Sequence, residues 1–204
     1  SETRIALDLQ HLLKWIDQPG ADVPSTIVAA GFQSSRLETM RSRTSAAYRG
    51  LYVLLQQRGA EDFFWKARIM DIDRNEKGID IHHIFPRKWC DDRKIAPKVY
   101  NSIINKTAIS YRGNRKIGGN APSDYLTKLE ADPAVQLTST ALDAILATHS
   151  IAPNFLRSDD FDGFFAERKS ALLRIIIQAM GKPAIDSTEP VADDEMEDEE
   201  EATA

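Results

Sequence analysis

The stretch Ile79-Asp80-Ile81-His82-His83-Ile84-Phe85-Pro86 carries two adjacent histidines at the end of a run rich in β-branched residues. Such a run predicts a β-strand over Ile79 to His83. Successive strand residues point to opposite faces, so at least one of the two imidazoles must face the core or a binding site. The pair therefore marks the end of this strand as either a packed core position or a functional site.

Two asparagines downstream suggest what the histidines do. Asn105 lies in Ile-Asn-Lys-Thr, just before a second brief strand expected over Thr107 to Ser110. Asn114 lies in Arg-Gly-Asn-Arg-Lys, within a short helix expected over Tyr111 to Lys116. Hydrolysis of a phosphodiester with one metal ion needs a base that works near neutral pH and a cation that neutralises the developing charge. Imidazoles suit the first task, and nitrogen and oxygen ligands suit the second.

A strand that ends in His-His, followed by spaced asparagines, resembles the HNH, or ββα-metal, nuclease motif. The resemblance implies that His83 is the general base and that His82 binds the metal. It implies that Asn105 braces the loop of the motif and that Asn114 is the last metal ligand, with Asn120 as a rival. The implied catalytic set is therefore His83, His82 and Asn105, with His82 and Asn114 as metal ligands. The zinc-knuckle cysteines of many relatives are absent.

The sequence His83-Ile84-Phe85-Pro86 also fits the His-x-x-Pro variant of the motif, which resembles the C-terminal nuclease domains of GmrSD-type and phosphorothioate-sensing restriction proteins. The likeness covers roughly Ser42 to Lys182 and is specific from Ile79 to Leu126. It implies a fragment of a bacterial phage-defence protein that cuts or nicks foreign, often modified, DNA. The implied cofactor is Mg²⁺ or Mn²⁺, with Zn²⁺ or Ni²⁺ also compatible. A further implied partner is an N-terminal nucleotide-hydrolysing domain, which nothing in this chain resembles.

The charge pattern favours a nucleic-acid partner. The formal net charge is −5, but the segment from Pro183 to Ala204 holds ten acidic residues and no basic ones, so the rest of the chain is basic. Nine basic residues lie between Arg87 and Lys116, as expected of a phosphate-binding surface. The alternative is a loop-rich surface that these side chains merely solvate. The candidate contacts to DNA are Arg87, Lys88, Lys106, Arg112, Arg115 and Lys116.

Composition predicts an ordinary soluble protein. Of the 204 residues 42% are hydrophobic and 28% charged, and no apolar run reaches the roughly 18 residues of a membrane span. The chain begins without a signal pattern and without Met, so we expect a cytoplasmic protein and a piece of a longer chain. One cysteine, Cys90, excludes an internal disulfide, and we expect it to be buried.

The hydrophobic pattern predicts a mainly α fold with a small embedded β element, that is, a ββα-metal core wrapped by helices. We expect a helical lead-in over 1–41, a nuclease domain over 42–182 and an acidic disordered tail over 183–204. The expected longer helices are Ile5 to Ile16, Pro24 to Ala30, Ser42 to Arg58, one opening at Pro122, Thr138 to Thr148, and Asp160 to Met180.

Several residues allow two interpretations. Asp80 is an extra metal ligand, a residue that orients one, or a surface aspartate. Trp89 and Tyr111 pack in the core or, alternatively, stack on bases. We expect His11 and His149 to be structural and Asn120 to adopt a left-handed turn conformation. The tail is a solubilising segment or a nucleic-acid mimic. For the whole chain, the competing function is a non-catalytic DNA-binding or interaction module.

Overall fold

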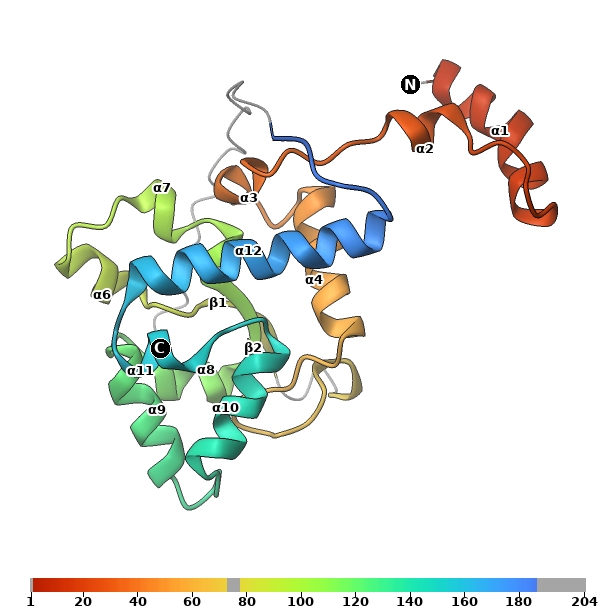
Figure 1. Ribbon diagram of the computed structural model, residues 1–204. Coiled ribbons are helices and arrows are strands. Elements are labelled where there is room, and N and C mark those ends of the chain that lie inside the picture. Colours follow the sequence, from red (N-terminus) through yellow and green to blue (C-terminus); the bar gives the residue numbers. More distant parts are fainter. Residues whose placement is uncertain (1, 73–77, 187–204) are drawn as a thin grey trace.

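The computed structural model describes residues 2–72 and 78–186, and it is mainly helical around one antiparallel strand pair (Figure 1). The polar sequence from Asp73 to Gly78 predicts a turn, but residues 73–77, like the acidic segment from 187 onward, lie outside the described residues. In chain order the elements are α1 (Glu2–Asp17), α2 (Ser25–Ala29), α3 (Arg36–Thr39), α4 (Ala46–Gln57), the 3-10 turn η1 (Ile69–Asp71), β1 (Ile79–His83), α6 (Arg87–Asp92), α7 (Pro97–Tyr100), the 3-10 turn η2 (Ile103–Asn105), β2 (Lys106–Ser110), α8 (Tyr111–Ile117), α9 (Pro122–Ala131), α10 (Ser139–Thr148), α11 (Pro153–Arg157) and α12 (Phe161–Met180).

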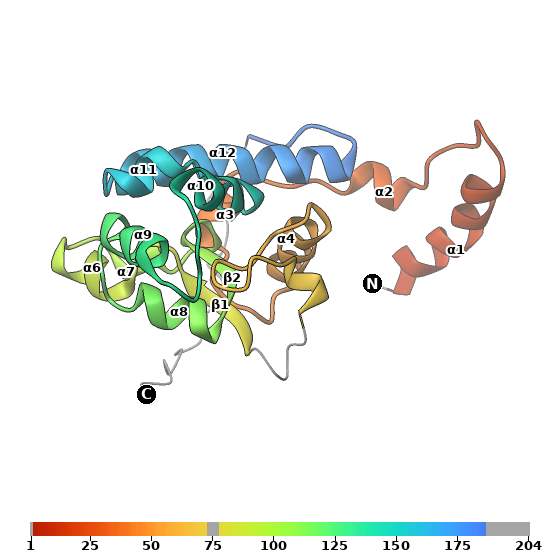
Figure 2. The same cartoon turned by 90° about the horizontal axis from the view of Figure 1, so that it is seen from below.

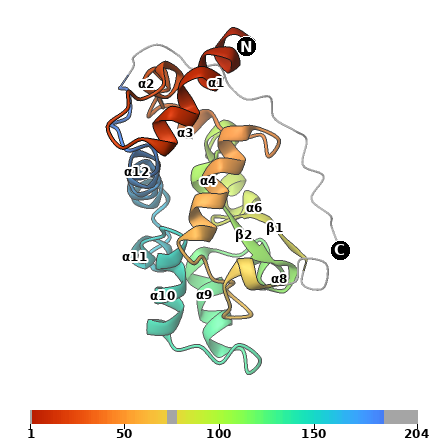
Figure 3. The ribbon, with the colours of Figure 1, turned by 90° about the vertical axis from the view of Figure 1, so that its right-hand side faces the viewer.

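The two strands pair over their full lengths, and α8 follows β2 directly. Ile79 lies opposite Ser110, and His83 lies opposite Lys106. The connection from β1 to β2 carries α6, α7 and η2, so the strands form an antiparallel pair without a tight turn. α8 packs against both strands. In two perpendicular views, α12 lies on one side of the body and the strand pair with α8 on the other (Figures 2 and 3).

Two apolar clusters hold this unit in place. The larger cluster surrounds Phe85 and includes Ile109 of β2 together with side chains from α6, α8, α9, α10 and α12. The second cluster joins α3, α4, η2 and the C-terminal half of α12, with Ile103 and Ile104 buried in it. The continuous stretch of η2 and β2 is therefore anchored in both clusters, through Ile103 and Ile104 in the second and Ile109 in the larger one. Burial of a Leu, Ile or Phe side chain contributes roughly 1.5–3 kcal/mol.

The helix boundaries follow local capping chemistry. The Ser45 hydroxyl caps α4 by accepting a hydrogen bond from the Tyr48 amide, so this helix begins later than the predicted Ser42. Thr138 and Asp160 cap α10 and α12 in the same way. Gly181 ends α12 with a left-handed backbone (φ 66°), which glycine adopts without a steric cost.

The predicted domain boundaries at 42 and 183 do not coincide with breaks in packing. Leu37 and Met40 are fully buried in the second cluster, so the body already includes α3. At the other end, the Ile185 amide donates a hydrogen bond to the Phe32 carbonyl, and the Ser34 hydroxyl donates one to Asp186. α1 and α2 project from the body (Figure 1). Among the described residues, no helix is long and apolar enough to cross a bilayer.

Candidate functional site

Asn105 is fully buried and holds the turn that follows the two histidines. Its Oδ1 accepts a hydrogen bond from the Phe85 amide at 2.8 Å, and its Nδ2 donates to the Phe85 carbonyl at 2.9 Å. Nδ2 also donates to the Tyr100 carbonyl at 3.0 Å. One amide side chain thus joins the end of β1 to the end of α7. These hydrogen bonds hold the loop after β1, which is the position that the family resemblance implies for Asn105.

His83 is buried against α7, with 9% of its surface exposed. Its Nε2 lies 2.9 Å from Oδ1 of Asn101, and its ring meets that of Tyr100 edge-on at 6.0 Å. Because Oδ1 is an acceptor, the neutral ring carries its hydrogen on Nε2 and its lone pair on Nδ1. The contacts with α7 therefore set both the orientation and the tautomer of His83.

His82 points to the other face of β1. It pairs with Thr107 in the strand register and shares its face with Ile109. α8 covers this face, because a Cβ placed on Gly113 would lie 3.8 Å from the Ile109 Cβ. Asn114 is the next residue of α8 and is half-buried. Strand alternation and helix packing thus place His82 and the start of α8 on the same side of the sheet.

The side-chain amides of Asn114 and Asn120 differ in their hydrogen bonds. In the described part of the chain, the Asn114 amide makes no side-chain hydrogen bond. Asn120 donates to the Ile117 carbonyl at 2.9 Å and accepts from Lys128 at 2.8 Å, so its amide caps the end of α8. The expected left-handed backbone at Asn120 is wrong, since the positive φ of this turn lies at Gly118. The geometry leaves Asn114 the better candidate for a metal ligand.

Asp80 takes the role of a surface aspartate. Its carboxylate forms an ion pair with Arg43 at 2.8 Å and accepts a hydrogen bond from the Ile81 amide. Arg43 also donates to the Ile81 carbonyl, so the pair fastens the segment before α4 to β1.

The six cations predicted to bind DNA lie in three different environments. Lys106 is only 4% exposed within β2, which does not fit a surface charge that contacts a phosphate. Arg87, Lys88 and Lys116 form ion pairs with Asp91, Asp92 and Asp132, respectively. Arg112 and Arg115 have no carboxylate within ion-pair distance among the described residues, and both stack on aromatic rings. These two arginines are the cations most available to a phosphate backbone.

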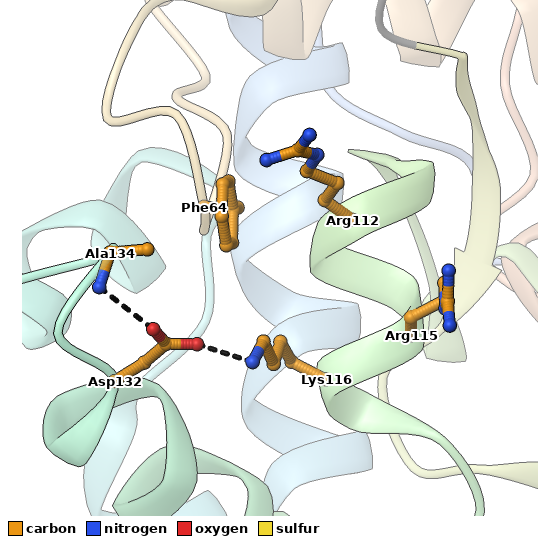
Figure 4. Close-up of a pocket in the computed structure, with 6 residues that line it drawn as sticks. All are labelled: Phe64, Arg112, Arg115, Lys116, Asp132 and Ala134. Carbon is orange, nitrogen blue, oxygen red and sulfur yellow. Dashed lines mark hydrogen bonds and ion pairs between the residues drawn. The ribbon is translucent and has the colours of Figure 1, made fainter.

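The available arginines border a pocket of about 470 Å³ beside α8. Figure 4 shows Arg112 and Lys116 directed toward Phe64 and Asp132 across this pocket, and Arg115 on the side of α8 away from Phe64. A second hollow of about 450 Å³ continues from it past Asn120 and Lys128. The predicted packing of Tyr111 is wrong, because its ring is 42% exposed beneath the Arg115 guanidinium. Trp89 and Cys90 are buried as expected, and burial raises the pKa of the Cys90 thiol to about 12.

Sequence reasoning missed Arg168 of α12, which binds the backbone on either side of Asn105. Its guanidinium is 1% exposed and donates to the carbonyls of Ile104 and Lys106, the two neighbours of Asn105. Burial lowers the pKa of Arg168 to about 9. The helical pattern contained a signal, since Arg168 stands four residues from both Phe164 and Leu172 on the buried stripe.

His149 and Asp62 are further buried polar residues that brace the strand pair. The His149 Nε2 donates a hydrogen bond to the Glu61 carbonyl at 2.7 Å, and its Nδ1 accepts one from the Thr107 hydroxyl at 2.7 Å. Burial lowers its pKa to about 4. Asp62 accepts hydrogen bonds from the amide and the hydroxyl of Ser110 at the start of α8. The structural role predicted for His149 agrees with these contacts.

Comparison with known proteins gives one distant relative. The chain is 23% identical over 133 residues to uncharacterized protein MJ0686 of Methanocaldococcus jannaschii, a match that covers 63% of this chain and 22% of the relative. The chain therefore spans only about a fifth of the length of this relative. No family model matches the chain, and no solved structure matches it.

Proposed function

We propose that the chain is a divalent-metal-dependent DNA endonuclease or nickase of the HNH type, which hydrolyses phosphodiester bonds as part of a bacterial restriction system. The observation that carries this proposal is the brace formed by Asn105. Asn105 fixes the backbone at Phe85, just after His82 and His83. The strands β1 and β2 and the helix α8 follow the order strand, strand, helix of the ββα motif.

In this proposal His83 removes the proton from the attacking water. Asn101 holds the hydrogen of the neutral ring on Nε2, so Nδ1 is the atom that accepts the proton. Asn105 and Arg168 keep the end of β1 and the start of β2 fixed while the charge on the ring changes.

The donor set fits a divalent cation with few protein ligands. An imidazole from His82 and the amide oxygen of Asn114 would hold the ion, and the described residues contain no cluster of three or more His, Cys, Asp or Glu side chains that would favour a closed zinc site. Such an ion, when bound, neutralises charge that develops on the phosphate and on the leaving oxygen. Mg²⁺ and Mn²⁺ match an oxygen-rich shell completed by water, and the imidazole also accepts Zn²⁺ or Ni²⁺.

DNA would be held through its backbone by Arg112 and Arg115, which gives affinity without reading sequence. The wider proposal adds a role in defence against phages, a cytoplasmic location, and a separate nucleotide-hydrolysing domain in the same protein. The length of the archaeal relative, of which this chain covers only 22%, supports a larger parent protein.

Supercoiled plasmid incubated with Mg²⁺ or Mn²⁺, with and without a chelator, tests the proposed activity. Open-circle product that disappears with the chelator supports nicking, and linear product supports paired cuts. A plasmid that stays supercoiled with every metal, although the protein binds it, favours the non-catalytic DNA-binding module instead.

A further inference from the structure

The pocket beside α8 lies between the segment that carries Phe64 and the helix α8, and the buried Asp62 hydrogen-bonds to both. Asp62 is fully buried, and its Oδ1 accepts hydrogen bonds from the amides of Phe64 and Trp65 at 2.9 and 2.8 Å. Its Oδ2 accepts one from the amide of Ser110, the residue that caps α8. The aromatic wall and the α8 wall therefore keep a fixed separation, and a ligand would meet a preformed pocket.

Arg112 extends the aromatic wall with a planar cation. Its guanidinium lies 5.6 Å from the ring centre of Phe64 and 5.1 Å from that of Trp65. In Figure 4 the Phe64 ring is seen edge-on beside the pocket, with Arg112 across from it. Phe64 is only 6% exposed, so a planar ring that enters here stacks mainly on the exposed guanidinium that the two aromatic rings hold in place.

The floor of the pocket presents a hydrogen-bond donor next to an acceptor. Lys116 forms an ion pair with Asp132, and the Asp132 Oδ1 accepts a hydrogen bond from the Ala134 amide at 2.8 Å. The hydrogen bond from Lys116 keeps the pKa of Asp132 below its usual range, so the carboxylate is ionised. The Lys116 side chain is 42% exposed and that of Asp132 only 10%, so a heterocycle edge that carries acceptors matches this floor, whereas a purely apolar ring does not.

We propose that this pocket binds one unpaired nucleobase of a DNA strand. The base would stack on the planar face of Arg112, whose N–H edge still reaches the backbone, with its polar edge at Lys116 and the adjoining phosphate near Arg115. The volume of about 470 Å³ falls among those of small-molecule sites, roughly 300–1,000 Å³. A paired base cannot enter, because its face and its edge are occupied within the duplex. The inference rests on the proposed function in that it takes DNA as the ligand.

The test compares two single strands of equal length under conditions that prevent cleavage. With chelator present and salt fixed, the full chain is titrated with a fluorescent mixed-sequence DNA strand and with the same strand made fully abasic. The two probes carry the same phosphate charge, so the ratio of their Kd values reports base contacts alone. Stacking of one base predicts that wild type binds the normal strand about tenfold more tightly.

Two variants and one matched control locate the contact. Ala134→Leu fills the pocket from an exposed position, and Arg112→Gln removes the stacked cation. Arg93→Gln is the control, since Arg93 is also an exposed arginine stacked on an indole, at 3.9 Å from the Trp89 ring and outside the pocket. Both pocket variants should reduce the ratio to near one. The control should weaken both strands equally and keep the ratio near ten.

Equal binding of the two strands by wild type overturns the pocket proposal and leaves DNA binding intact. A tenfold ratio that survives in both folded pocket variants also overturns it. Failure to bind either strand overturns both the pocket and the proposed function. Circular dichroism of each variant shows that it is folded before its ratio is compared.

Discussion

At the scale of single residues, the site depends on buried amides and rings whose hydrogen bonds are complete. Asn105 satisfies the backbone on both sides of the turn after β1, and His149 bridges β2 to the chain at Glu61. Buried polar groups of this kind are costly to leave without partners, at roughly 1–3 kcal/mol each. Substitution of either residue should therefore lower the stability of the protein in a way that can be measured.

Replacement of Asn105 by Ala should lower the free energy of unfolding by about 3–5 kcal/mol. The substitution leaves the Phe85 amide and the carbonyls of Phe85 and Tyr100 without their side-chain partner. Urea denaturation measures the change. Asn154→Ala, at an exposed position of α11, is the control and should shift stability by less than about 0.5 kcal/mol. Equal shifts for the two variants would contradict the bracing role.

His149 should make the protein less stable in mild acid. Its pKa is lowered by burial to about 4, from an ordinary value of 6.5, so the unfolded chain binds its proton first as the pH falls. The stabilisation is complete above pH 6.5 and is lost as the pH falls toward 4, by up to about 3 kcal/mol. Urea unfolding of wild type and His149→Gln at pH 7 and pH 5 measures this. If the two proteins lose the same stability between these pH values, the assignment to His149 is wrong.

At the scale of elements, the sequence predicted what local patterns determine. The long helix α12 ends at the expected positions because Asp160 and Gly181 mark its two ends. The strands β1 and β2 were predicted to within one residue from their β-branched runs. The short helices α6 and α11 were missed, because five or six residues carry too little periodicity to distinguish them from turns. The helix α7 overlaps the stretch from Lys98 to Asn105, where the sequence predicts a short helix or a turn.

The candidate site was predictable only in part, for a physical reason. His82, His83 and the two asparagines were visible as unusual residues around a strand pair. Their supporting residues were not, because only the packed chain brings their contacts together. Asp62 and Arg168 bind backbone groups, and Asn101 binds the His83 ring. Burial of Lys106 was also hidden, since its place within β2 became evident only from the strand pairing.

Substitution of Arg168 by Met should destabilise the protein by about 2–4 kcal/mol, although it removes a buried charge. The carbonyls of Ile104, Lys106 and His149 lose their donor, and Met offers none in return. Arg174→Met on the same helix is the matched control, since Arg174 is exposed and its ion pair within the described part of the chain is with Glu167. Thermal denaturation of both variants decides the matter. A variant at 168 that is as stable as the control, or more so, would contradict the account.

At the scale of the whole molecule, the body is separate from the N-terminal arm formed by α1 and α2 (Figure 1). The arm exposes Leu9, Leu13 and Ile16, whereas the apolar clusters of the body begin beyond it. Its contacts with the body include hydrogen bonds from Lys182 to the carbonyls of Ile27 and Val28. The body should therefore fold without the arm.

Deletion of residues 1–30 should change the Tm by less than about 3 °C, because it removes exposed contacts and leaves both clusters complete. Differential scanning fluorimetry measures the shift, and plasmid nicking should persist in the shortened chain. A Tm that falls by more than about 8 °C would mean that the arm is part of the folded core.

The most direct test of the central claim compares plasmid nicking by wild type, His83→Ala and His11→Ala. His11 is an exposed histidine of α1 and serves as the matched control. With Mg²⁺ or Mn²⁺, wild type and His11→Ala should convert supercoiled plasmid to open circles. His83→Ala should lose this activity by at least about a hundredfold, while it still folds and binds DNA. Nicking by His83→Ala at the wild-type rate would contradict the assignment of His83 as the base.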